Sequence, residues 1–173
     1  MTPELRRVLD GWMPRPAFVL DRHWNFEVLN DAARVVFGYG ENDRNCLVTF
    51  FTSTRYRSVI GSWAEKAPDL VAEFRADAAR FPDDPRFERL ATKLSAASPV
   101  FAELWRRHDV RDNPHGVKTI LNSDVGEMAF EFTALPLADR PGDRLFLFNP
   151  KPGTSTRANL NKLMAGLRLV DAG

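Results

Sequence analysis

The chain has 173 residues, of which 44% are hydrophobic and 27% are charged, and its formal net charge is +1. Such a chain can bury a sizeable core, and its near-neutral charge provides no general attraction to nucleic acid or to an anionic membrane. The single cysteine, Cys46, allows no disulfide within the chain, and no apolar run suggests a secretory leader or a membrane span. We therefore expect a cytoplasmic protein with one domain over residues 1–173.

The N-terminal part predicts a helix followed by a hairpin. Thr2 before Pro3 is typical of a helix N-cap, and apolar residues then recur at helical spacing up to Trp12. Residues 17–20 and 26–29 are short apolar runs joined by a polar segment, which indicates two antiparallel strands. Asn30 then opens a short helix that runs toward Phe37.

The middle of the chain has a helical hydrophobic period. A stripe from Ile60 to Phe81 predicts a long helix, and Pro68 predicts a kink or a break in it because proline removes one ladder hydrogen bond. Asp84 and Ser98 each precede a proline and are predicted to cap two further helices. In the second of these, four residues share one face: Phe101, Leu104, Trp105 and His108.

The last third changes to strand periodicity. Residues 117–121, 127–137 and 145–148 predict three strands, and alternation within the second indicates one buried face. A final amphipathic helix follows around residues 160–167. We therefore predict an α+β fold, in which a five-stranded antiparallel sheet carries a large helical insertion and terminal helices.

Two sets of motifs resemble known families. Residues 17–20, 28–30 and 37–39 resemble the opening of a PAS domain. The block Ser98-Pro99-x-Phe101-x-x-Leu104-Trp105-x-x-His108-Asp109-Val110, together with Pro82-Asp83-Asp84-Pro85 and Gly126-Glu127, is similar to the ligand-binding domain of MmyB-like transcription regulators. This second resemblance covers nearly the whole chain.

The resemblance implies a PAS-like sensor of a small molecule, and the family suggests fatty-acid-like ligands. Regulators of this family pair the sensor with an XRE-type helix-turn-helix, which no helix pair of this chain matches. DNA contact would therefore pass through a helix-turn-helix domain outside this chain. The His-Pro pair that the family usually has before the Gly-Glu hairpin is Asn122-Ser123 here. Whether the chain is a dissected or a stand-alone domain stays open.

A ligand site is expected between the sheet and the helices, where PAS-type folds hold their ligands. Such cavities are mostly apolar with a few polar anchors. The predicted apolar lining is Trp63, Phe74, Phe101, Trp105, Phe130 and Phe132. For each of these residues the alternative is a packed core.

Four polar residues are candidate anchors for a ligand head group: Arg44, Asn45, Arg75 and His108. Arg75 could hold a carboxylate in bidentate fashion, and its alternative is a surface arginine. Arg44 and Asn45 could instead serve a turn or a helix cap. His108 could donate to a head group in a protonation-dependent way, or could be a core histidine bonded to a backbone carbonyl.

No catalytic motif is present, and the spacing of His23, His108, His115 and Cys46 does not fit a metal site. Because catalytic motifs are absent, we expect no enzymatic activity. The residues after Cys46 differ from those of flavin-binding photoreceptors, so we expect no cofactor. The favoured function is a sensing domain for a small molecule such as a fatty acid, and the alternative is a ligand-free interaction or dimerisation module. We expect a homodimer, with residues 2–12 as a dimer or coupling element or else as a helix packed on its own sheet.

Overall fold

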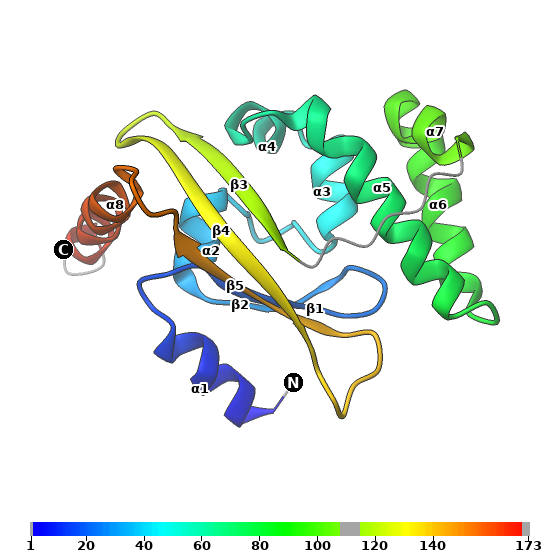
Figure 1. Ribbon diagram of the computed structural model, residues 1–173, viewed down its shortest axis with the longest axis horizontal. Coiled ribbons are helices and arrows are strands. Elements are labelled where there is room, and N and C mark those ends of the chain that lie inside the picture. Colours follow the sequence, from blue (N-terminus) through cyan, green and yellow to red (C-terminus); the bar gives the residue numbers. More distant parts are fainter. Residues whose placement is uncertain (1, 108–114, 171–173) are drawn as a thin grey trace.

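A five-stranded antiparallel sheet in the order β2-β1-β5-β4-β3 forms the centre of the protein (Figure 1). The computed structural model describes residues 2–107 and 115–170. The strands are β1 (Ala17–Leu20), β2 (Phe26–Leu29), β3 (His115–Asn122), β4 (Gly126–Pro136) and β5 (Arg144–Pro150). The α+β prediction is confirmed, because the five strands pair only in antiparallel fashion and the helices lie outside the sheet. The N-terminal hairpin pairs with β5 and not with β3, the strand that follows it in sequence.

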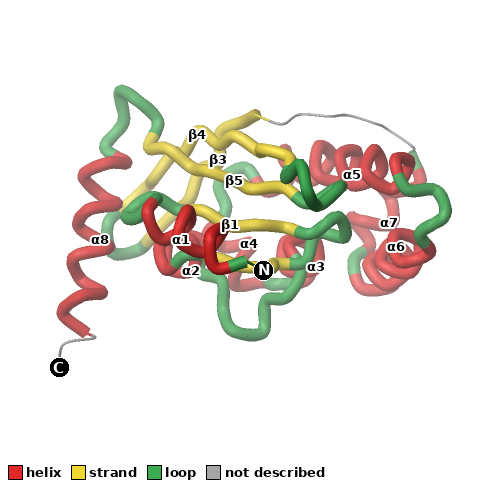
Figure 2. Tube along the Cα trace, turned by 90° about the horizontal axis from the view of Figure 1, so that it is seen from below, coloured by secondary structure: helices red, strands yellow, loops and turns green. Residues whose placement is uncertain are grey.

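Helices cover both faces of this sheet. They are α1 (Pro3–Gly11), α2 (Asp31–Phe37), α3 (Cys46–Thr52), α4 (Thr54–Val59), α5 (Trp63–Arg80), α6 (Pro85–Ala97), α7 (Pro99–Arg106) and α8 (Thr156–Val170). Helices α3 to α7 form the large insertion between β2 and β3, and α1 lies apart from them (Figures 1 and 2). The predicted helical insertion is therefore present, bounded by terminal helices.

The predicted N-caps are confirmed. The hydroxyl of Thr2 accepts the backbone N–H of Leu5 at 3.4 Å, and the Asp84 carboxylate accepts that of Arg86 at 3.1 Å. The hydroxyl of Ser98 accepts the N–H of Phe101 at 3.2 Å. Each cap satisfies a donor that has no partner within its helix, so local side-chain chemistry sets where these helices begin.

The middle of the chain differs from the prediction in two ways. Helix α5 begins at Trp63, and Ile60 instead ends α4 and forms an isolated bridge with Ile120 of β3. Of the kink or break predicted at Pro68, the break is absent, because α5 runs continuously through this residue. Proline removes one ladder bond, and the buried side chains on both sides of it, from Trp63 to Phe74, hold the helix against the core.

The sheet separates two hydrophobic cores. The larger one lies on the inner face, beneath the helical insertion, and includes Phe37, Phe101 and Phe148. The smaller one lies on the outer face, where Leu9 of α1 packs against β1, β2 and β5. Strand residues alternate between the faces, so β1 supplies Phe18 to the first core and Val19 to the second.

Candidate functional site

A cavity of about 130 Å³ lies between the inner face of the sheet and helices α3, α4 and α5. Its walls are mainly apolar and include Phe18, Leu70, Phe132, Phe146 and Phe148. Aromatic rings from three neighbouring strands thus face one helix across the gap. The cavity occupies the position between sheet and helices that the sequence predicted for a ligand site.

Two local features keep this space open. Helix α5 turns Lys66, Leu70 and Glu73 toward the cavity, since residues at i, i+4 and i+7 share a helix face. Gly116 of β3 lies opposite Phe132 in the sheet register, and a Cβ at Gly116 would come within 2.8 Å of the Phe132 ring. The glycine therefore leaves room for the phenylalanine to lie along the wall.

The polar end of the cavity is built around Lys118 of β3. Its Nζ lies 2.8 Å from the Tyr56 hydroxyl and 3.3 Å from the Tyr39 hydroxyl, and it lies 4.0 Å from the centre of the Phe37 ring. The two hydroxyls are 3.0 Å apart. Within the described part of the chain, no carboxylate forms an ion pair with this amine.

Burial controls the protonation of this polar end. Desolvation lowers the pKa of Lys118 to about 8, because the charged amine has left water without gaining a counter-ion. Burial also raises the pKa of Cys46 to about 11 and raises the pKa values of Tyr39 and Tyr56 well above their ordinary value. At neutral pH these four side chains therefore present hydrogen-bond donors and no negative charge, which suits an anionic head group.

The Glu73 carboxylate on the cavity wall has a cationic partner. Glu73 lines the cavity and pairs with Arg144 at 3.2 Å, and Arg144 also pairs with Asp77 at 2.9 Å. Asp77 in turn accepts the indole N–H of Trp24 at 2.8 Å. Phe148, whose ring centre lies 5.7 Å from Lys118 Nζ, follows Arg144 by four residues on β5, about 13 Å along the strand.

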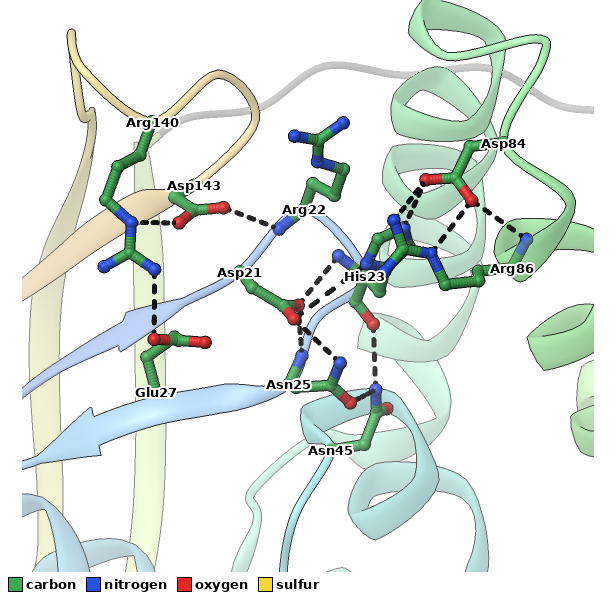
Figure 3. A network of polar contacts seen from close by, with 10 residues as sticks. All are labelled: Asp21, Arg22, His23, Asn25, Glu27, Asn45, Asp84, Arg86, Arg140 and Asp143. Atoms are coloured by element: carbon green, nitrogen blue, oxygen red, sulfur yellow. Dashed lines mark hydrogen bonds and ion pairs between the residues drawn. The ribbon is translucent and has the colours of Figure 1, made fainter. Parts of the chain in front are cut away.

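Figure 3 shows the polar network that holds the loop between β1 and β2, the loop that carries Trp24. The loop between β1 and β2 is tied to the start of α6, since His23 Nε2 lies 2.7 Å from a carboxylate oxygen of Asp84. Arg86 hydrogen-bonds the same carboxylate and holds the pKa of Asp84 well below its usual range. Trp24 follows His23 with a φ of 68°, a left-handed conformation that these contacts hold in place.

Among the predicted lining residues, Phe132 lines this cavity. Phe74, Phe101 and Trp105 instead form a packed cluster between α5 and α7, with ring centres 5.5 Å (Phe74–Trp105) and 5.8 Å (Phe101–Trp105) apart. Trp63 is buried and donates its indole N–H to the carbonyl oxygen of Phe50 at 2.9 Å. Phe130 is fully buried on the inner face of β4. These residues match the packed-core alternative, and none of them is among the lining residues.

The predicted anchors that the structure describes lie outside the lining as well. The Arg75 guanidinium donates to the carbonyl oxygen of Trp105 and lies 3.9 Å from the centre of the Trp105 ring. Asn45 caps α3 by accepting the N–H of Val48 at 3.0 Å, and it donates to the carbonyl oxygen of His23 (Figure 3). Arg44 is exposed. The predicted anchor His108 falls outside the described residues.

The structure adds three residues that the sequence analysis did not select: Lys118, Tyr39 and Tyr56. A signal for Lys118 was present, since it alternates with Gly116 and Ile120 on the apolar side of a strand. Lysine is rarely buried without a partner, so a lysine at such a position is a candidate for a functional residue. No comparable signal marked Tyr39 and Tyr56, because their meeting depends on how α4 packs.

Comparison with known families supports a regulatory role. A family model described as the MmyB-like transcription regulator ligand binding domain matches residues 1–163. The chain belongs to this family. No curated protein matches the sequence. The MmyB-like domain is thus the ligand-binding part of a transcription regulator, and no helix in its described residues has the length and hydropathy needed to cross a membrane.

Proposed function

We propose that this MmyB-like domain senses an amphipathic acid, such as a fatty acid, whose chain enters the apolar cavity and whose carboxylate pairs with Lys118. The observation that carries this proposal is the Lys118 amine, which lies at the end of an apolar cavity without a counter-ion from the described chain. A buried cation is costly unless it is paired. An incoming carboxylate would supply the missing charge, and Tyr56 could donate a further hydrogen bond.

The energetics favour such a ligand. Each buried methylene contributes about 0.8 kcal/mol, so ten would contribute roughly 8 kcal/mol against association costs of about 4 kcal/mol or more. A charge-assisted hydrogen bond to the head group adds about 1.5–3 kcal/mol.

The biological setting that we propose follows from the family. Residues 1–173 would act as one cytoplasmic sensing domain that forms a homodimer, because operators read by helix-turn-helix pairs mirror two-fold protein symmetry. DNA would be bound through a helix-turn-helix domain outside this chain. His108 remains a predicted second anchor for the head group.

Thermal unfolding with decanoic acid tests the proposal. We expect the acid to raise the melting temperature of the wild-type protein, because a ligand that binds only the native state stabilises it by mass action. Lys118→Met should weaken binding about tenfold, which corresponds to the loss of one charge-assisted hydrogen bond. Leu70→Trp should abolish binding, since the larger ring fills the cavity.

Matched controls separate ligand binding from general stability. Leu90 is a half-buried leucine on α6 that does not line the cavity, and Lys93 is an exposed lysine on the same helix. Leu90→Trp and Lys93→Met should leave the response to decanoic acid unchanged. Native mass spectrometry of the gently purified protein reports both a co-purifying ligand and the dimer. A monomer with no bound small molecule and no response to acids of any chain length would contradict the proposal and favour the interaction module.

A further inference from the structure

Lys118 has the surroundings of a reactive amine as well as those of an anion anchor. Its Nζ faces a cavity whose walls are mainly apolar, and two phenolic hydroxyls lie within 3.3 Å of it. The aromatic rings of Phe37, Tyr56 and Phe148 enclose the amine, with ring centres at 4.0 Å, 5.4 Å and 5.7 Å from Nζ. Within the described residues, no carboxylate forms an ion pair with this amine to fix it in the charged form.

We propose that Lys118 captures aliphatic aldehydes as a reversible imine, so that the cavity takes the aldehyde as well as the acid form of an amphipathic ligand. This inference rests on the proposed function, because it places the same alkyl chain in the same cavity. It goes further by assigning a covalent step to one nitrogen atom. Desolvation in an apolar pocket is one of the ways in which proteins activate a lysine for Schiff-base chemistry.

The step balances without an oxidant or a reductant. The lone pair of the neutral amine attacks the carbonyl carbon and forms a C–N bond, while the carbonyl π pair moves to oxygen and takes a proton from the Tyr56 hydroxyl. The nitrogen returns a proton to Tyr56, which gives a carbinolamine. Loss of the hydroxyl group with the remaining N–H proton then releases water and leaves the C=N bond.

The hydroxyl geometry fits this proton exchange. The Tyr56 hydroxyl lies 2.8 Å from Nζ and hydrogen-bonds the Tyr39 hydroxyl at 3.0 Å. Tyr56 can therefore donate its proton while it accepts a hydrogen bond from Tyr39. Burial raises the pKa values of both phenols, which keeps them protonated donors at neutral pH. Burial lowers the pKa of Lys118 to about 8, so a sizeable fraction of this amine is neutral under the same conditions.

The other lysines of the chain serve as internal controls. Lys93, Lys151 and Lys162 are exposed, and Lys66 is half-buried at the edge of the cavity. None of these four amines is enclosed by the aromatic rings and phenolic hydroxyls that surround Lys118. Selectivity for Lys118 over these lysines is therefore the signature of the proposed site.

The experiment is reductive trapping with limiting decanal and sodium cyanoborohydride, followed by peptide mass mapping. We expect one alkyl group on Lys118, at a level on the order of tenfold above each exposed lysine, because the neutral fraction of its amine is far larger. Lys118→Arg keeps the positive charge and cannot form an imine, so trapping at this position should vanish. Lys93→Arg, at an exposed position on α6 outside the cavity, is the matched control and should leave the labelling of Lys118 unchanged.

Decanoic acid binding is measured in parallel so that the two proposals can fail separately. Labelling at Lys118 that is no greater than at the exposed lysines would overturn the imine. If the wild-type protein and Lys118→Arg still respond to decanoic acid in that case, the proposed acid-sensing function stands. If neither the acid nor the aldehyde binds, both proposals fall. Retained decanoic acid binding by Lys118→Arg also shows that this variant is folded.

Discussion

At the residue scale, the position of Lys118 in β3 determines the environment of its amine. The alternation of β3 turns this lysine to the inner face, between Gly116 and Ile120. The hydroxyls of Tyr39 and Tyr56 solvate the amine in place of water, and the ring of Phe37 adds a cation–π contact. These contacts offset only part of the desolvation cost, which leaves the pKa of Lys118 lowered.

The desolvation cost of the charged Lys118 amine makes the free energy of unfolding depend on pH. The pKa of Lys118 is lowered in the folded protein to about 8, whereas the unfolded chain keeps an ordinary lysine. Between about pH 8 and pH 10.5 the unfolded state therefore binds more protons, so the contribution of Lys118 to the free energy of unfolding rises with pH. Below pH 8 the folded protein bears the full cost of the buried charge.

We expect Lys118→Met to remove this dependence. The stability of the variant relative to the wild-type protein should decrease by about 1–3 kcal/mol as the pH rises from about 7 to 10. Urea unfolding of both proteins at several pH values measures the difference, in which the titrations of Cys46 and of the tyrosines common to both proteins largely cancel. A difference that stays constant with pH would mean that Lys118 is not desolvated.

At the element scale, α1 is held by its own sheet. Leu9 is fully buried against the outer face and Val8, its neighbour, is 51% exposed. The indole N–H of Trp12, just after the helix, donates to the carbonyl oxygen of Phe148 on β5 at 3.2 Å. The contacts agree with the alternative in which residues 2–12 pack on their own sheet, and Val8 remains available to any partner.

Two substitutions of α1 test this packing. Leu9→Ala should lower the free energy of unfolding by about 2–5 kcal/mol, because it removes a buried side chain and leaves a cavity. Val8→Ala is the matched control on the exposed face and should change it by less than about 0.5 kcal/mol. Equilibrium unfolding in urea measures both. Equal effects of the two substitutions would contradict the placement of α1 against the sheet.

At the scale of the whole molecule, Asn30 joins the two sides of the sheet. Its side-chain oxygen accepts the N–H groups of Ala17 and Ala33 at 3.0 Å and 2.9 Å. Its amide nitrogen donates to the carbonyl oxygens of Leu9 and Arg15 at 3.1 Å and 2.9 Å. One fully buried side chain thus connects α1, the start of β1 and the first turn of α2.

We expect Asn30→Ala to lower the free energy of unfolding by about 2–4 kcal/mol, because it leaves several buried backbone groups without partners. Exposed Asn42 provides the control, and Asn42→Ala should have an effect within about 0.5 kcal/mol. Thermal and urea unfolding measure the change. A loss no larger than that of the control would show that the four hydrogen bonds of Asn30 do not tie the two sides together.

Much of the fold could be predicted because its signals are local. The caps Thr2, Asp84 and Ser98 and the alternation of the strands act over a few residues, so the sequence indicates where these elements begin and which faces they bury. Pro68 does not break α5, because the packing of a long helix outweighs one missing hydrogen bond. The short helices α3 and α4 were missed because their apolar residues span too few turns to establish a period.

The sequence by itself determined the fold class, the family and the expectation of a cavity between sheet and helices. Only the tertiary structure decided which side chains line that cavity. Phe74 and Phe132 are equally apolar in sequence, yet one lies in a packed core and the other on the cavity wall. The physical reason is that a cavity is space left where elements distant in sequence fail to meet, and that depends on the packing of β3, α4 and α5 rather than on the pattern within any one of them.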